Sequence, residues 1–198
     1  MTGRSRVAVV VASTRPTRIC GGISRWIQQE LRVAHADRGL ECLEYDRIDL
    51  AEVDLPFLDE PLMPALGQYA HEHTKAWSRL VRGYDGFVFV LPQYNWGYPA
   101  VLKNALDFLY EEWSGKPVTF AAYGTHGGSM AAAQLPQVLA ALHMRELDDH
   151  LEIVVTLDDV DADWQVKDLE SVLSPHRDQI RRIDRQMADA LTKPGADD

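Results

Sequence analysis

Short apolar runs alternate along the chain with segments in which apolar residues recur every three or four positions. The most apolar run covers residues 7–12 (VAVVVA), and further runs cover residues 86–91, 117–123 and 151–156. An unbroken run of β-branched and small apolar residues is typical of a strand covered on both faces. The pattern predicts a sheet that lies between two layers of helices.

Amphipathic periodicity fills the segments between these strands. A more polar strand is expected at residues 40–45, and residues 55–67 carry three prolines and are expected to be irregular. The expected helices begin at residue 23 and end at Gly39, and then cover residues 69–82, 100–110, 130–143 and 175–191. Asp107, Glu111 and Glu112 are expected to form an exposed acidic face.

Five strands that alternate with helices predict an α/β protein with a parallel sheet, right-handed crossovers and helices on both faces. We expect the flavodoxin-like strand order 2-1-3-4-5. The length fits one domain over residues 1–198, with a frayed tail at residues 192–198.

Composition narrows the function classes. A net charge of −10 argues against nucleic acid or an anionic membrane as the main partner, because both require a clustered basic face. No apolar run is long enough for a membrane span. Cys20 and Cys42 are too few for a disulfide framework and lack the spacing of a metal site. A cytoplasmic protein without a metal is expected.

Three loops at the carboxyl ends of strands have unusual composition: residues 13–22, 92–99 and 123–129. In the order 2-1-3-4-5 their strands are neighbours, so the loops are expected to line one crevice, where such sheets bind ligands. The loop after the last strand lacks comparable glycine, proline or aromatic content and is not counted among them.

The first loop suits a phosphate. Ser13 and Thr14 offer hydroxyls, Arg15 and Arg18 offer guanidinium groups, and Gly21 opens a helix whose N-terminus favours an anion. The alternative is an ordinary turn with solvated arginines.

Cys20 stands at the start of the same helix. Its thiol either has a lowered pKa there or is a small packed side chain, and the packed thiol is favoured.

The second loop suits a flat heterocycle. After Pro92, the aromatic rings of Tyr94 and Trp96 offer walls, and the amides of Gln93 and Asn95 offer hydrogen bonds. A core aromatic cluster is the alternative.

The third loop offers backbone N–H groups and little side-chain volume. His126 is placed over the heterocycle, where it favours negative charge; the alternative is a solvated turn residue followed by a glycine helix cap. The candidate residues here are Tyr123, Gly124, Thr125, His126, Gly127 and Gly128.

These segments resemble the NADPH-dependent FMN reductase family, especially its yeast-type quinone reductases. The likeness runs from about residue 7 to 155 and is most specific over residues 92–107. It rests on the Ser-Thr-Arg loop through Arg18, Ile19 and Cys20, on Trp77-Ser78-Arg79, on PQYNWGYP (92–99) with LKNALD (102–107), on Gly115-Lys116-Pro117, on Tyr123-Gly124 and on His126-Gly127-Gly128-Ser129.

The resemblance implies an FMN phosphate site at Ser13, Arg15 and Arg18, and flavin contacts at residues 92–95 and 123–128. It also implies a homodimer or homotetramer with each flavin near a subunit interface. No side chain is assigned a catalytic role, because the flavin carries the chemistry.

The leading hypothesis is an FMN-dependent NAD(P)H oxidoreductase that reduces quinones, free flavin or a similar small-molecule electron acceptor by ping-pong hydride transfer. The alternatives are an electron-carrier flavodoxin-like protein with protein redox partners, a flavin reductase that supplies a monooxygenase, and a flavin-free binding module. The acceptor, the preference between NADPH and NADH, and the tightness of FMN binding stay open.

Overall fold

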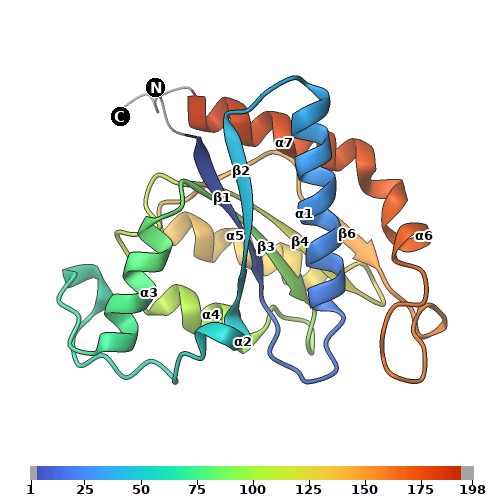
Figure 1. The fold of residues 1–198 in the computed structure, drawn as a ribbon. Coiled ribbons are helices and arrows are strands. Elements are labelled where there is room, and N and C mark those ends of the chain that lie inside the picture. The colour runs from blue at the N-terminus through green and yellow to red at the C-terminus, as the bar shows by residue number, and fades with distance from the viewer. Residues whose placement is uncertain (1–3, 193–198) are drawn as a thin grey trace.

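The computed structural model describes residues 4–192 and contains a central sheet with helices on both sides (Figure 1). The strands are β1 (Ser5–Val11), β2 (Leu43–Asp49), β3 (Gly86–Pro92), β4 (Pro117–Gly124), β5 (Arg145–Glu146) and β6 (Leu151–Val154). The α-helices are α1 (Cys20–Asp37), α2 (Leu50–Val53), α3 (Glu72–Arg82), α4 (Ala100–Asp107), α5 (Ser129–Ala141), α6 (Leu169–Leu173) and α7 (Arg177–Thr192). Short 3₁₀ turns cover Pro64–Leu66, Leu157–Asp159 and Ser174–His176.

The sheet is parallel and has the order β2-β1-β3-β4-β5, which confirms the predicted flavodoxin-like order. The expected fifth strand consists of two pieces. β5 pairs with the start of β4 and β6 pairs with its end. Between the two pieces the chain leaves the ladder, and the Thr119 hydroxyl donates to the Asp149 carbonyl at 2.7 Å.

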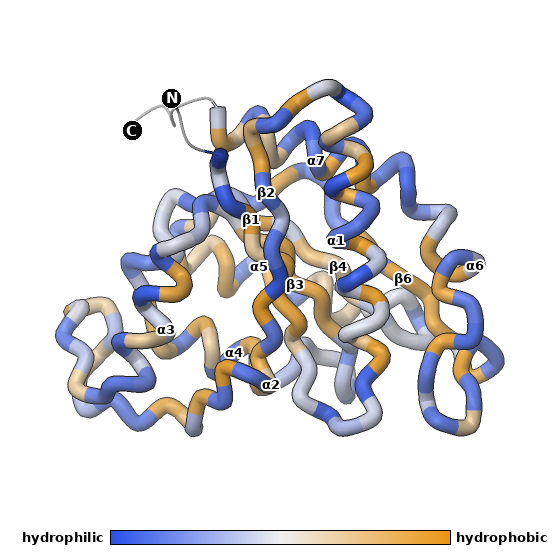
Figure 2. Tube along the Cα trace, in the orientation of Figure 1, coloured by the Kyte–Doolittle hydropathy of each residue, from blue (hydrophilic) through white to orange (hydrophobic). Residues whose placement is uncertain are grey.

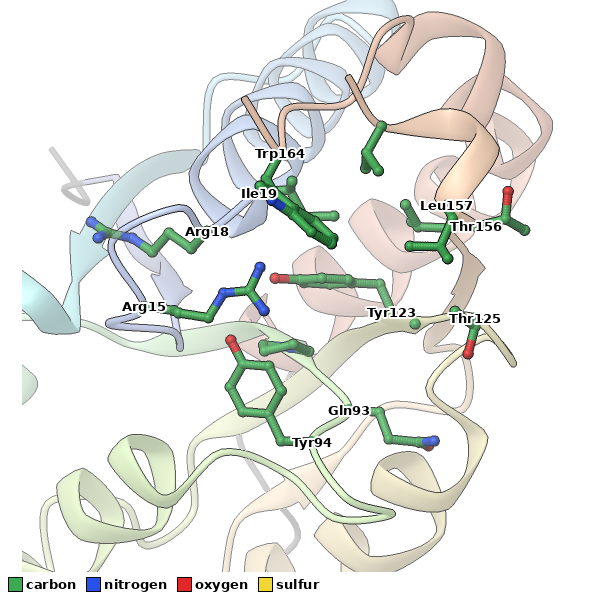
Figure 3. Close-up of a pocket in the computed structure, with 14 residues that line it drawn as sticks. Arg15, Arg18, Ile19, Gln93, Tyr94, Tyr123, Thr125, Thr156, Leu157 and Trp164 are labelled. Atoms are coloured by element: carbon green, nitrogen blue, oxygen red, sulfur yellow. The ribbon is translucent and has the colours of Figure 1, made fainter. Parts of the chain in front are cut away.

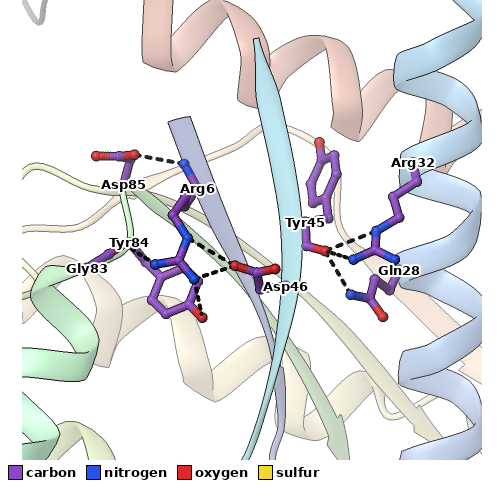
Figure 4. A network of polar contacts seen from close by, with 8 residues as sticks. All are labelled: Arg6, Gln28, Arg32, Tyr45, Asp46, Gly83, Tyr84 and Asp85. Atoms are coloured by element: carbon purple, nitrogen blue, oxygen red, sulfur yellow. Dashed lines mark hydrogen bonds and ion pairs between the residues drawn. The ribbon is translucent and has the colours of Figure 1, made fainter. Parts of the chain in front are cut away.

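The second strand lies later in the sequence than expected, at Leu43–Asp49 and not at residues 40–45. Its charged residues obscured it, because β2 is an edge strand that alternates buried and exposed positions. Arg6 on β1 donates to Asp46 on β2 at 2.6 Å and also contacts Tyr84 (Figure 4). The ion pair therefore stabilises a strand that the apolar pattern alone does not predict.

The strand β1 separates two apolar layers. Val7, Val9 and Val11 belong to the cluster beneath α1 and α7, whereas Ala8 and Val10 belong to the cluster beneath α3, α4 and α5. All five residues are at most 1% exposed. Figure 2 shows the apolar residues concentrated along the strands. This two-sided burial explains the unbroken apolar run in the sequence.

The segment after α4 corrects the expected acidic face. The helix ends at Asp107, and the chain then turns inward, so the side chain of Glu112 is fully buried. Its carboxylate accepts hydrogen bonds from Ser78 (2.6 Å), Tyr69 (2.9 Å) and Arg82 (2.9 Å). Burial alone would raise the pKa of Glu112, but these contacts outweigh burial and hold the pKa below its ordinary value.

A second buried carboxylate, Asp184, joins α7 to α1 and β2. Asp184 accepts hydrogen bonds from Tyr45 at 2.8 Å and from Arg38 at 2.8 Å. His35 donates its Nδ1–H to Asp184 at 3.0 Å and accepts the backbone N–H of Leu43 at Nε2. The side chain of Asp184 is 0% exposed, and both of its oxygens have partners, as a buried charge requires.

The expected tail, residues 192–198, lies outside the described residues except for Thr192. Thr192 is the last residue of α7. Within residues 4–192, no helix is both long enough and apolar enough to cross a membrane. The same part of the chain contains no group of three or more His, Cys, Asp or Glu side chains suited to a metal ion.

Candidate functional site

A cleft of about 240 Å³ lies at the edge of the sheet where the strands β1, β3, β4 and β6 end (Figure 3). Four loops contribute to it, one after each of these strands. The lining residues are Arg15, Arg18, Ile19, Pro92, Gln93, Tyr94, Tyr123, Gly124, Thr125, Val155, Thr156, Leu157, Val160 and Trp164. The three loops expected from the sequence therefore do meet.

The two arginines of the first loop have different surroundings. The guanidinium of Arg18 donates to Asp49 at 2.7 Å and points away from the cleft, whereas that of Arg15 points into it (Figure 3). Among residues 4–192, no carboxylate forms an ion pair with Arg15. Arg15 is therefore the arginine of this loop that is available to an anion.

The N-terminus of α1 opens toward this loop. No side chain within the described residues caps it, and the Gly22 N–H donates to the Ile19 carbonyl at 3.0 Å, so the N–H groups of Cys20 and Gly21 remain available to a ligand.

The thiol of Cys20 is fully buried and donates to the Val90 carbonyl at 3.2 Å. Burial raises the pKa of this thiol to about 12. The structure therefore agrees with the interpretation of Cys20 as a small packed side chain. Cys20 and its neighbour Gly21 do not line the cleft.

The second loop forms a tight turn. Tyr94 and Gly97 exchange backbone hydrogen bonds of 2.9 and 3.0 Å, and Asn95 and Trp96 between them have φ values of 46° and 68°. The Tyr94 hydroxyl lies 2.9 Å from the hydroxyl of buried Ser13 and joins this loop to the first. Asn95 and Trp96 lie outside the cleft lining, and so does Ser13.

Gln93 connects the second and third loops. Its side-chain oxygen accepts the backbone N–H groups of Met130 (2.9 Å) and Ala131 (3.3 Å) at the start of α5. Gln134 of α5 in turn donates to the Trp96 carbonyl at 2.9 Å. The turn after β3 and the helix after β4 are therefore held together by two amide side chains.

The third loop supplies Tyr123, Gly124 and Thr125 to the cleft. Gly128 has φ 75° and caps α5, and a Cβ there would lie 2.7 Å from the backbone nitrogen of Tyr123. The glycine is thus required by the close approach of the backbone.

His126 is exposed, and its Nδ1 lies 3.1 Å from the Thr125 hydroxyl. His126 and Gly127 do not line the cleft, and neither does Thr14, which lines a neighbouring hollow with Phe57 and Asn104. The placement of His126 over a heterocycle stays a prediction.

The fourth loop, after β6, was not expected to take part, but it supplies Val155, Thr156, Leu157, Val160 and Trp164. The loop carries four aspartates and has no glycine or proline, so composition did not mark it as a ligand-binding loop. A tryptophan within this acidic stretch was the available signal. Its indole lies over the Arg15 guanidinium, 5.9 Å from the carbon at the centre of that group.

These features fit FMN, which combines a phosphate with a flat ring system. A guanidinium without a carboxylate partner lies near an uncapped helix N-terminus, where a phosphate binds favourably. The rings of Tyr94 and Tyr123 offer flat apolar walls, and the ring of Trp164 lies over the Arg15 guanidinium. Burial raises the pKa of the Tyr123 hydroxyl well above its ordinary value, so this residue stays uncharged.

The family model that describes NADPH-dependent FMN reductases matches residues 5–157. The chain belongs to this family. This NADPH-dependent FMN reductase family member is 45% identical over 142 residues to an NAD(P)H-dependent FMN reductase of Schizosaccharomyces pombe, covering 71% of this chain and 68% of the relative. It is 41% identical over 145 residues to an NAD(P)H-dependent FMN reductase of Saccharomyces cerevisiae, covering 70% of this chain and 75% of that relative. The prediction that the chain is an oxidoreductase that uses FMN and NAD(P)H is confirmed.

Solved structures support the fold of this family member. An oxidoreductase from Corynebacterium diphtheriae superposes with a TM-score of 0.71 at 18% identity and covers 98% of this chain and 100% of that one. The NAD(P)H:acceptor oxidoreductase FerB of Paracoccus denitrificans superposes with a TM-score of 0.67 at 22% identity. This match covers 94% of this chain and 98% of FerB. At these identities the likeness establishes the flavodoxin-like fold.

Proposed function

We propose that this FMN reductase family member binds FMN in the cleft and passes electrons from NAD(P)H to a quinone, free flavin or a similar small acceptor by a ping-pong reaction. One observation carries the proposal: Arg15, without a carboxylate partner in residues 4–192, points into a cleft with aromatic walls beside the open N-terminus of α1. The names of relatives support the acceptor class, because they include a quinone reductase of Escherichia coli that is 28% identical over 148 residues.

In this proposal the first loop binds the phosphate. Arg15 and the leading N–H groups of α1 make the contacts, and Ser13 and Thr14 supply hydroxyls nearby. Arg18 acts mainly by holding the loop to Asp49, because its guanidinium is already paired. Charge-assisted hydrogen bonds from an arginine suit a phosphate better than neutral donors do.

The second and third loops hold the ring system. We assign ring contacts to residues 92–96 and 123–128, with Tyr94 and Tyr123 as walls. FMN, when bound, supplies the hydride acceptance and donation that no side chain provides. The role of the chain is to orient the ring and to limit the space beside it.

The size of the cleft favours ping-pong kinetics. A volume of about 240 Å³ is below the usual range for a site that encloses one drug-sized ligand, so the nicotinamide and the acceptor have no room beside the ring at the same time. The nicotinamide must then leave before the acceptor binds.

We also propose a homodimer or homotetramer in the cytoplasm, built from one domain per chain. Large apolar side chains are exposed beside the cleft and the neighbouring hollow: Phe57 is 85% exposed, Trp96 68% and Leu157 69%. A second subunit that covers them also encloses a ring that this cleft is too small to enclose alone. Two free cysteines, Cys20 and Cys42, fit a reducing compartment.

An anaerobic stopped-flow experiment tests the reaction. The FMN-loaded protein is mixed with NADPH or NADH, loss of flavin absorbance is recorded, and a quinone or free FMN is then added. Rapid bleaching followed by rapid reoxidation supports the proposal. Bleaching that neither nicotinamide produces indicates an electron carrier, FMN that leaves after each turnover indicates a flavin reductase that supplies another enzyme, and a protein that binds no FMN refutes the proposal.

A further inference from the structure

The loop after β6 is built to hold Trp164 in one place. The carboxylate of Asp161 accepts the backbone N–H groups of Asp163 and Gln165, each at 2.9 Å. Val160 and Val166 form an antiparallel bridge at the base of the loop. A short hairpin results, and Trp164 lies in its turn with φ 58°. That conformation is unfavourable for a bulky side chain, so the hydrogen bonds of the hairpin must maintain it.

Core packing does not explain this arrangement. The Trp164 residue is 49% exposed, whereas buried residues of the core such as Trp113 are at most a few per cent exposed. What the indole does contact is the Arg15 guanidinium, whose central carbon lies 5.9 Å from the centre of the ring. Figure 3 shows Trp164 on one side of the cleft and Arg15 extending into it from the opposite loop.

The kind of contact matters for what Arg15 is able to bind. An indole ring attracts a guanidinium through its π face and has no hydrogen-bond acceptor atom, so the five N–H donors of the guanidinium remain free. A carboxylate partner uses those donors, as Asp49 does for Arg18. The indole therefore restricts the Arg15 side chain without occupying the atoms that an anion needs.

Restriction of a long side chain before binding increases affinity, because less rotamer freedom is lost when the ligand arrives. We propose that Trp164 is a positioning residue that pre-orients Arg15 for the phosphate of the flavin. This inference rests on the proposed function. Trp164 lies beyond residues 5–157, the segment that matches the family model, so it is a feature of this chain's own C-terminal part.

The experiment measures the dissociation constants of the cofactor-free protein for FMN and for riboflavin, which lacks the phosphate. Trp164→Ala should weaken FMN binding about two- to fivefold, the range of an exposed cation–π contact, and should change riboflavin binding by less than that. Trp164→Phe, which keeps a ring, should lose less. The ratio of the two constants is informative even if the variant is less stable, because both constants come from the same preparation.

Two further variants control for other effects. Trp26→Ala removes an indole that lies under another arginine, Arg177, at 5.3 Å on a surface formed by α1 and α7, and it should leave the ratio unchanged. In an Arg15→Ala background, Trp164→Ala should cause no further loss of phosphate discrimination.

An unchanged FMN-to-riboflavin ratio in Trp164→Ala overturns the inference, and so does an equal loss in the Arg15→Ala background. Failure of the proposed function has a different signature: the parent protein itself binds neither flavin, or binds both equally, in which case the inference fails with it.

Discussion

The cleft and the Asp184 cluster are two polar regions of the same fold, but their charged groups differ in whether they have partners. Around Asp184, both carboxylate oxygens and both ring nitrogens of His35 have partners. At the cleft, Arg15 has an indole face as its contact, and no side chain among residues 4–192 caps the first turn of α1. Satisfied polar groups hold elements together, whereas unsatisfied ones at a surface are available for a ligand.

Asp184→Ala tests the structural side of this comparison and has the largest expected effect. It leaves Arg38, His35 and Tyr45 without their shared partner, and loss of one member of a buried ion pair typically costs about 3–5 kcal/mol. The free energy of unfolding in urea should fall by that order. Under conditions where the variant is still folded, its FMN affinity should stay close to that of the parent. If the variant is as stable as the parent, the Asp184 cluster does not contribute to the stability of the fold.

Arg15→Ala tests the ligand side. A charge-assisted contact is worth about 1.5–3 kcal/mol, so FMN affinity should fall tenfold or more while riboflavin affinity changes little. Because Arg15 has no carboxylate partner in residues 4–192 and its contact with Trp164 is an exposed one, the unfolding midpoint should move little. Titration of flavin fluorescence and urea unfolding measure the two quantities. Unchanged FMN affinity would remove Arg15 from the phosphate site.

Arg18→Ala is the matched control within the same loop and should have a smaller effect. Its ion pair with Asp49 is partly exposed, with 23% and 13% of the two side chains accessible, and such pairs contribute about 1 kcal/mol or less. We expect a loss of FMN affinity below about fivefold, together with a small loss of stability. A loss as large as that of Arg15→Ala would mean that Arg18 leaves Asp49 to bind the phosphate.

Glu112→Gln should have the smallest effect, a loss of stability that is present at neutral pH and shrinks in acid. The pKa of Glu112 is held below its ordinary value, so the ionised carboxylate stabilises the fold above that value and this contribution is lost as the pH falls toward the lowered pKa. Urea midpoints at pH 7 and pH 4 should therefore differ less in the variant than in the parent. If the urea midpoint changes equally between pH 7 and pH 4 in the variant and the parent, other carboxylates cause the acid sensitivity.

The apolar pattern predicted most of the fold, because strands buried on both faces leave a clear signal. It was wrong where charge replaced apolar content. The strand β2 is stabilised at its edge by the pair Arg6–Asp46, and the polar residues of Leu43–Asp49 concealed it. Glu112 was expected to be exposed because the helix was extended past Asp107, where the chain in fact turns inward.

The candidate site was predictable where ligand chemistry coincides with loop composition. Arg15, Tyr94 and Tyr123 were identified in that way. Trp164 was not, because its position depends on a hairpin held by the carboxylate of Asp161, and its neighbours in the sequence resemble a solvated acidic loop. The pairing of Arg18 with Asp49 is likewise a contact between distant residues that a local pattern does not encode.

The two amide links made by Gln93 and Gln134 have a consequence for hydrogen exchange. They join the turn after β3 to α5, so one side of the cleft is a single unit whose amide protons at Met130 and Ala131 have a side-chain acceptor. The opposite side, residues 160–166, is a separate unit, held by the hydrogen bonds of its own hairpin and by the packing of Val160 and Val166 against the core beneath α1 and α7. Exchange at the start of α5 should therefore occur together with that of the turn after β3, whereas residues 160–166 should exchange as a unit of their own.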